Sequence, residues 1–169
     1  HLDEGALVQL TSDEYDDRDP SWSPDGSRIA FSSDRTSFGK QGAYNLFSYE
    51  VDSGLIRYIT YGDRYDLAPT WSPSGGTIAF ISAARDSTGR YGTQDIWTTD
   101  ADNSQPRLAP AEGEGNIDPT RQLSGRTLNR LTRFVSAAYD PVWTSDDHIV
   151  FTSFEGLQFS IRQLPDVSE

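Results

Sequence analysis

Short apolar runs separated by polar turns make up most of the chain. The first clear case is residues 19–33, where two apolar stretches flank the sequence Ser-Pro-Asp-Gly at residues 23–26. Proline fixes its own φ and glycine readily takes positive φ, so this pattern predicts two strands joined by a tight turn. No segment of useful length shows the period of 3.6 residues that is typical of a helix. The hydrophobic pattern therefore indicates an all-β chain.

The same strand, turn and strand recur twice more along the chain. Each copy has a tryptophan two residues after a proline and 11 residues after a threonine; the tryptophans are Trp22, Trp71 and Trp143. The threonines end short β-rich stretches, which are residues 6–11, 55–60 and 128–132. A third strand is predicted after each hairpin, at residues 45–51, 95–99 and 157–161. One repeat is therefore four short strands joined by turns.

The copies differ in two places. Trp22 and Trp71 are 49 residues apart, whereas Trp71 and Trp143 are 72 apart, so the second copy carries about 23 extra residues within 103–127. These residues are rich in Pro, Gly and acids, which favours an exposed, solvated loop over a binding element. In the third copy the turn at residues 144–147 is one residue shorter and has no Pro or Gly. We expect this turn to be tighter or bulged.

Four-stranded units repeated every 40 to 50 residues are typical of a β-propeller. The shared residues, Leu-Thr, a gap and then Pro-x-Trp-Ser-Pro-Asp-Gly-x-x-Ile-Ala-Phe-x-Ser, resemble the WD40-like (PD40) repeat of the TolB type, which also occurs in propellers of the prolyl oligopeptidase class. The resemblance covers residues 6–164 apart from the insertion. It implies a lead-in at residues 1–5 and a propeller segment at 6–169, with about three blades of four antiparallel strands. The three tryptophans would then lie at blade packing positions.

Three blades are too few to close a ring, because closed propellers have about four to eight. Residues 6–11 are predicted to be an outer fourth strand that has no blade of its own, and the last blade stops after its third strand near Leu164. Two arrangements follow. The blades pair with the missing blades of a larger propeller, which we favour for the natural protein, or two copies combine as three plus three blades.

The amino-acid composition limits the kinds of molecule that the chain is expected to bind. The chain has 26 Asp and Glu against 14 Lys and Arg, a net charge of −12 and one lysine. Such a surface repels phosphate backbones, so we expect a cationic protein or peptide and no nucleic acid. Two explanations fit this charge: a protein that must stay hydrated at high salt, or an acidic protein from a GC-rich genome that favours arginine over lysine.

No apolar run is long enough for a membrane span. There is no methionine, so we expect a mature or excised portion of a longer precursor, and the TolB resemblance suggests the periplasm or cell surface. There is no cysteine, which rules out disulfides and thiolate metal sites.

Candidate binding residues lie in the loops that precede each tryptophan. In a propeller such loops run along the mouth of the channel, where ligands usually bind. Aromatic and anionic side chains gather in these loops, at Tyr15, Asp17, Asp19, Tyr65, Asp66, Tyr139 and Asp140. They would offer a surface for a cationic or peptide partner. The alternative is that the tyrosines pack the rim and the aspartates cap turns.

The densest acidic run lies at residues 13–19. Calcium favours oxygen ligands from closely spaced carboxylates, so the candidate calcium ligands are Asp13, Glu14, Asp16 and Asp17. The run lacks the order of an EF-hand loop, and the equivalent segments of the other copies hold far fewer acids. The sequence therefore favours a solvated loop here, and we expect no cofactor.

Catalytic motifs are sparse. The only histidines are His1 and His148, the latter at the start of a strand predicted to be buried, and there is no Gly-x-Ser-x-Gly motif. We therefore expect a non-catalytic interaction scaffold. One alternative is the propeller domain of a larger peptidase, prolyl oligopeptidase-like or a metallopeptidase, whose catalytic domain lies outside this chain. Another is a lyase or glycosidase that works through Asp17, Asp66 and Asp140.

Overall fold

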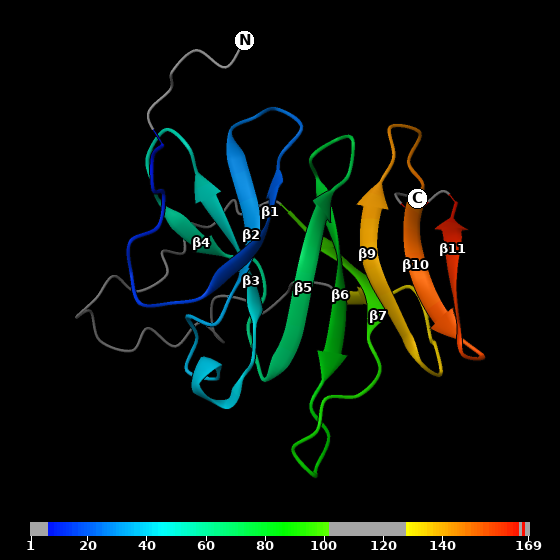
Figure 1. The fold of residues 1–169 in the computed structure, drawn as a ribbon. Helices are drawn as coiled ribbons and strands as arrows, with labels where there is room; N and C mark the ends of the chain where they lie inside the picture. The colour runs from blue at the N-terminus through cyan, green and yellow to red at the C-terminus, as the bar shows by residue number, and fades with distance from the viewer. Residues whose placement is uncertain (1–6, 102–127, 166, 168–169) are drawn as a thin grey trace.

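A computed structural model describes residues 7–101, 128–165 and 167. These residues form three antiparallel sheets (Figure 1). The first sheet contains β1 (Asp17–Trp22), β2 (Arg28–Ser33), β3 (Asn45–Glu50) and β4 (Ile56–Tyr58). The second contains β5 (Arg64–Trp71), β6 (Thr77–Ala84), β7 (Asp95–Asp100) and β8 (Leu128–Arg130). The third contains β9 (Ala137–Trp143), β10 (Ile149–Glu155) and β11 (Gln158–Leu164). One short 3₁₀ helix, η1 (Gly39–Gln41), lies between β2 and β3.

Each sheet follows the order of the chain, and the sheets stand side by side (Figure 1). The first strand of one sheet lies beside the first strand of the next, so that β5 contacts both β1 and β9. The repeat that was predicted from the tryptophan and proline spacing is therefore confirmed as three sheets of four, four and three strands.

The described residues form three apolar clusters: one in each junction between neighbouring sheets, and a third within the first sheet that contains Phe31, Phe47 and Tyr58. In the first junction Trp71 and Phe80 of the second sheet pack against Ala30 and Leu46 of the first. In the second junction, Trp143 packs with residues of β6 and β7. Trp71 is 5% exposed and Trp143 is 8% exposed, as expected for packing residues.

Trp22 differs from the other two tryptophans. It is 59% exposed, because the face of the first sheet that carries it has no neighbouring sheet among the described residues. Trp22 stands at the same position of the repeat as Trp71 and Trp143, but a packing contact between sheets is confirmed only for the latter two.

A β-bulge interrupts the first strand of every sheet just before its proline. The residues at this position have positive φ, namely Asp19 (55°), Ala68 (51°) and Asp140 (49°). Between β1 and β2 the register shifts from Arg18 to Ser21, and the other two sheets shift at the equivalent place. Proline has no backbone N–H to donate to the neighbouring strand, and the bulge places it where the ladder needs no donor. The bulge also turns the side chain before the proline away from the regular alternation of the strand.

The turns after the three tryptophans have the conformations that their sequences predicted. Gly26 and Gly75 take positive φ and close equivalent turns in the first two sheets. In the third sheet Asp147 takes the positive φ of 66°, and the backbone bond from Thr144 reaches His148 four residues on. The equivalent bond from Ser23 reaches Arg28 five residues on. The expectation of a tighter third turn is confirmed.

Residues 7–11 are not a strand, so the prediction of a fourth strand at residues 6–11 is wrong for the described part. Leu7, Val8 and Leu10 are exposed. A strand needs a partner for its backbone groups, and none of the described strands pairs with residues 7–11. His148 is also not buried in a strand but lies just before β10, with Nδ1 3.2 Å from Oδ2 of Asp146. The predicted insertion at 103–127 and the lead-in at 1–5 lie outside the described residues.

None of the described residues belongs to a helix that is long and apolar enough to cross a bilayer.

Candidate functional site

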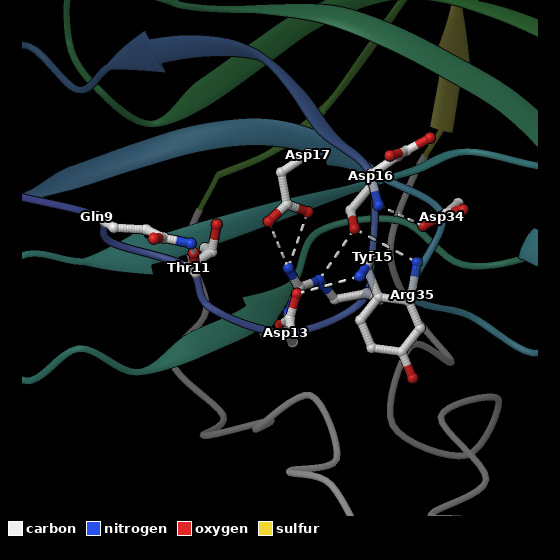
Figure 2. Close-up of polar contacts among 9 residues, drawn as sticks. Gln9, Thr11, Asp13, Tyr15, Asp16, Asp17, Asp34 and Arg35 are labelled. Carbon is white, nitrogen blue, oxygen red and sulfur yellow. Dashed lines mark hydrogen bonds and ion pairs between the residues drawn. The ribbon is translucent and has the colours of Figure 1, made fainter.

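Asp17 binds an arginine rather than facing solvent (Figure 2). Both carboxylate oxygens of Asp17 accept from Nη2 of Arg35 at 2.8 Å, and Nη1 donates to Asp13 at 2.9 Å. Nε of Arg35 donates to Ser33, which lies opposite Asp17 in the β1–β2 ladder. Arg35 is only 7% exposed, and its guanidinium lies 5.4 Å from the ring centre of Tyr15. Asp17 therefore links the start of β1 to the segment just after β2 through Arg35.

Asp66 also pairs with an arginine in the second sheet, but that arginine, Arg64, lies on β5 together with Asp66. Asp66 is fully buried, and Ser82 donates to its Oδ1. Nε of Arg64 lies 3.2 Å from the same oxygen, and Nη2 donates to Ser82 at 2.7 Å. The other oxygen, Oδ2, has no hydrogen-bond partner in the described part of the chain. Two of the predicted site residues, Asp17 and Asp66, are thus structural carboxylates.

The third sheet also has a serine that is bonded to an arginine, but its acid lies at a different position of the repeat. Nε of Arg162 donates to Ser153 at 2.8 Å, and its Nη2 donates to Glu155. Ala138 stands opposite Ser153, where the first two sheets have an aspartate. One serine per sheet therefore receives a guanidinium, from Arg35 just after β2, Arg64 on β5 or Arg162 on β11. Sequence reasoning missed these arginines, although a serine recurs four residues after the isoleucine that pairs with each tryptophan, namely Ile29, Ile78 and Ile149.

Asp95 is a further buried carboxylate that sequence reasoning missed. It is 1% exposed and lies at the start of β7. It accepts hydrogen bonds from the hydroxyl of Thr132 at 2.9 Å, the backbone N–H of Phe134 at 2.8 Å and the guanidinium of Arg130. These bonds tie β7 to the chain that leads into the third sheet.

Asp19 and Asp140 are different, because they are exposed and belong to none of the ion pairs among the described residues. Both lie at the bulge position of a first strand. Oδ2 of Asp19 accepts from the backbone N–H of Ala68 at 3.1 Å, which links the bulges of β1 and β5. Neither carboxylate is paired with an arginine or lysine in the part of the chain that the structure describes.

The three predicted tyrosines do not form one cluster. Tyr15 is 37% exposed in the loop before β1. Tyr65 lies between two other rings, with its centroid 5.7 Å from that of Tyr44 and 5.2 Å from that of Tyr91. Burial raises the pKa of Tyr44, while Arg18 acts in the opposite direction. Tyr139 on β9 lies 6.4 Å from the exposed ring of Phe159.

The candidate calcium ligands do not form a metal site as they stand. Within the described ranges no group of three or more His, Cys, Asp or Glu residues is placed to hold a metal ion. Asp13 and Asp17 turn to Arg35, and the backbone N–H of Asp16 donates to Asp34 at 2.9 Å (Figure 2). A calcium ion at these carboxylates would have to displace the guanidinium.

Comparison with known proteins places this geometry in a family. The model of the TolB beta propeller domain (PD40) matches residues 1–112. The chain belongs to this family. No curated protein matches it.

Solved structures agree with the TolB propeller fold. TolB from Agrobacterium tumefaciens is 22% identical with a TM-score of 0.61, over 91% of this chain and 46% of that one. Hydrazine synthase from Kuenenia stuttgartiensis is 17% identical with a TM-score of 0.60, over 87% of this chain and 23% of that one. At these identities the likeness shows the fold alone. The chain spans less than half the length of either protein.

As blades of a TolB-type propeller, the three sheets have their first strands at the inner edge. The contacts of β5 with β1 and β9 agree with this placement. Asp19 and Asp140 are therefore exposed carboxylates on the inner edge of the arc of blades. Asp17 and Asp66, in contrast, are paired with arginines inside their own blades.

Proposed function

We propose that the chain is a non-catalytic TolB-like propeller segment that acts as an interaction scaffold, and that a cationic peptide or protein segment binds along its inner edge. The observation that carries this proposal is the pair of exposed carboxylates, Asp19 and Asp140, which stand at the same position of two inner strands and have no cationic partner among the described residues. The periplasm or cell surface is the location that we propose, on the TolB likeness.

The charge of the whole chain supports a cationic partner. The net charge of −12 attracts positively charged groups from a distance and speeds their association. Desolvating a carboxylate is costly unless a cation or a donor replaces the lost water, so an uncompensated acid favours a partner that supplies one.

The backbone at the bulge supports a binding role for the same residues. A non-glycine residue at positive φ is strained, and such strain often occurs where a side chain must be presented in one direction. Asp19, Ala68 and Asp140 share this conformation, with φ of 55°, 51° and 49°, so the bulge belongs to every blade, and two of the three blades place an acid at it. The partly buried ring of Tyr65, on the strand between those of the two acids, adds aromatic surface of the kind that anchors a peptide.

Binding of a fluorescent hexa-arginine peptide tests the proposal. Asp19→Asn with Asp140→Asn removes both charges and keeps an oxygen that accepts from Ala68, so the fold should be retained. We expect affinity to fall by about tenfold, since two charge pairs are lost. The matched control is Asp52→Asn with Asp100→Asn, which makes the same change of net charge at exposed residues away from the first strands.

A general electrostatic effect would weaken binding equally in both double variants, and that result would refute the proposed site. Binding should also weaken as salt is raised, because screening reduces the attraction between exposed charges.

A further inference from the structure

The junction between the first and second sheets holds buried polar atoms that have no hydrogen-bond partner in the described part of the chain. These atoms are Oγ of Ser32, Oγ of Ser48, Oδ2 of Asp66, Nε1 of Trp97 and Oγ1 of Thr99. A buried polar atom without a partner costs free energy, because it has lost its bond to solvent water. Such atoms in a folded protein therefore call for an explanation.

The strand ladder places two of these atoms on the face of the first sheet that meets the second. Ser32 pairs with Leu46, and Ser48 pairs with Ala30. Leu46 and Ala30 belong to the apolar cluster of the first junction, and paired residues of antiparallel strands share a face. Asn45, whose side chain also has no partner among the described residues, directly precedes Leu46 and so lies on the other face.

The other three atoms lie on the facing side of the second sheet. Trp97 pairs with Phe80 and Thr99 pairs with Ile78, and both partners belong to the same apolar cluster. Asp66 pairs with the residue two positions after Phe80, which is therefore on the same face. All of these unpartnered atoms thus belong to one junction.

The second junction has apolar residues at equivalent positions. Equivalence follows from the ladders, counted from the isoleucine that pairs with each tryptophan. On this count, Ser32, Asp66 and Thr99 of the first junction correspond to Ile81, Ala138 and Leu164 of the second. Ile81 and Ala138 belong to the apolar cluster there, and Leu164 packs against it. Among the described residues, no unpartnered buried side-chain atom lies in the second junction.

The unpartnered atoms differ in the bonds that they can make. A carboxylate oxygen such as Oδ2 of Asp66 only accepts hydrogen bonds, the indole N–H of Trp97 only donates them, and the hydroxyls do both. Water both donates and accepts, and it commonly bonds to buried polar groups that have no protein partner. A cation could not accept from Trp97, and it would be repelled by Arg64, whose guanidinium lies 4.8 Å from the centre of the Trp97 ring. The chemistry therefore favours water.

We propose that internal water molecules occupy the first junction, where they donate to Oδ2 of Asp66 and accept from the N–H of Trp97, and that the second junction is dry. Oδ1 of Asp66 already accepts from Ser82 and Arg64, so water completes the bonding of this buried carboxylate. The site lies between two sheets and not at the exposed carboxylates of the inner edge, so it does not rest on the proposed function.

Nuclear Overhauser effects between water and indole N–H protons test the proposal in the isotope-labelled chain. Trp97 should show a cross-peak with water that stays bound long enough to tumble with the protein. Trp143 is the control in the same sample, because it lies in the second junction and its N–H donates to Asp147 at 2.8 Å. A cross-peak of equal size on Trp143, or none on Trp97, would overturn the proposal.

A hydroxyl proton that exchanges with solvent would give the same cross-peak without internal water. The double variant Ser48→Ala with Thr99→Val removes the hydroxyls that lie with Trp97 on the third strands of the two sheets. Field-dependent relaxation of the water oxygen nucleus reports internal water independently of hydroxyl protons. A cross-peak that persists in the variant, or that falls together with the oxygen signal, supports the proposal. A cross-peak that disappears while the oxygen signal is unchanged would contradict it.

Potassium chloride separates water from a cation in the junction. With water in place, the indole chemical shift of Trp97 should change no more than that of Trp143 as the salt is raised. A saturable shift confined to Trp97 would show that a cation binds there, and would overturn the proposal. Circular dichroism checks that the double variant keeps its sheets, and the comparison of Trp97 with Trp143 needs only the unaltered chain.

Discussion

Asp66 and Asp140 lie on the first strands of neighbouring blades, but only one of them is buried. Asp66 is fully buried and binds Arg64 and Ser82, whereas Asp140 is exposed and binds no cation among the described residues. The difference comes from two positions of one repeat. Asp66 lies three residues before its proline and points to the serine of the next strand; Asp140 lies at the bulge, directly before its proline.

The comparison shows that acidity alone does not identify a binding residue. The blade uses the carboxylate at one position to neutralise a buried guanidinium, and the bulge presents the carboxylate at the other position to solvent. Replacing residues of each kind should therefore separate stability from binding.

The largest expected effect is on stability, from Asp66→Ala. Removing this carboxylate leaves Arg64 without its buried partner, and breaking a buried pair in this way costs about 3–5 kcal/mol. The control is Asp63→Ala, since Asp63 pairs with Arg85 at 2.9 Å but its side chain is 41% exposed. We expect that control to cost less than about 1 kcal/mol. Urea unfolding measures both, and equal losses would show that Asp66 is not a structural carboxylate.

A smaller loss of stability is expected from Thr132→Val. The hydroxyl of Thr132 accepts from the N–H of Ile96 and donates to Asp95, both at 2.9 Å. The substitution leaves a buried amide and a buried carboxylate each short of one bond, which costs about 1–3 kcal/mol. Thr93→Val is the control, because Thr93 is exposed between β6 and β7. A change within about 0.5 kcal/mol is expected there, and a similar value for Thr132→Val would contradict the bonding.

The smallest effect concerns Asp25, an exposed carboxylate in the turn after β1. Hydrogen bonds from Ser23 and Ser27 lower its pKa from 3.8 to about 2. Because the pKa is lower in the folded protein, the ionised carboxylate stabilises the turn above about pH 4, and this stabilisation is lost as the pH falls through about 2. Ser23→Ala should raise the pKa toward 3.8, as measured by an NMR titration of the Asp25 side chain. An unchanged midpoint would show that Ser23 does not hold the carboxylate.

Much of the fold was predictable because the repeat is local. The spacing of Trp22, Trp71 and Trp143 from their prolines predicted the hairpins, and the shortened sequence at residues 144–147 predicted the tighter turn. The failure at residues 7–11 has a physical cause, since an alternating pattern becomes a strand only where a neighbour accepts its backbone bonds, and no described strand does so here.

The site was harder to predict because its contacts join residues that are distant in sequence. Arg35 lies 18 residues after Asp17, whereas Arg64 precedes Asp66 by two. No single spacing reveals such pairs. The bulge was also hidden, because the residue before a proline usually takes an extended conformation. Asp19 has φ of 55° instead, which follows only from the paired strands.

The most direct test of the two kinds of carboxylate measures Asp66→Ala beside the double variant Asp19→Asn with Asp140→Asn, in urea unfolding and in peptide binding below the unfolding transition. The predicted result is a crossed pattern. Asp66→Ala loses stability by about 3–5 kcal/mol and keeps its affinity for the arginine peptide, while the double variant keeps its stability within about 0.5 kcal/mol and loses affinity by about tenfold. Both variants losing the same property, in either assay, would contradict the division of the acids into structural and binding sets.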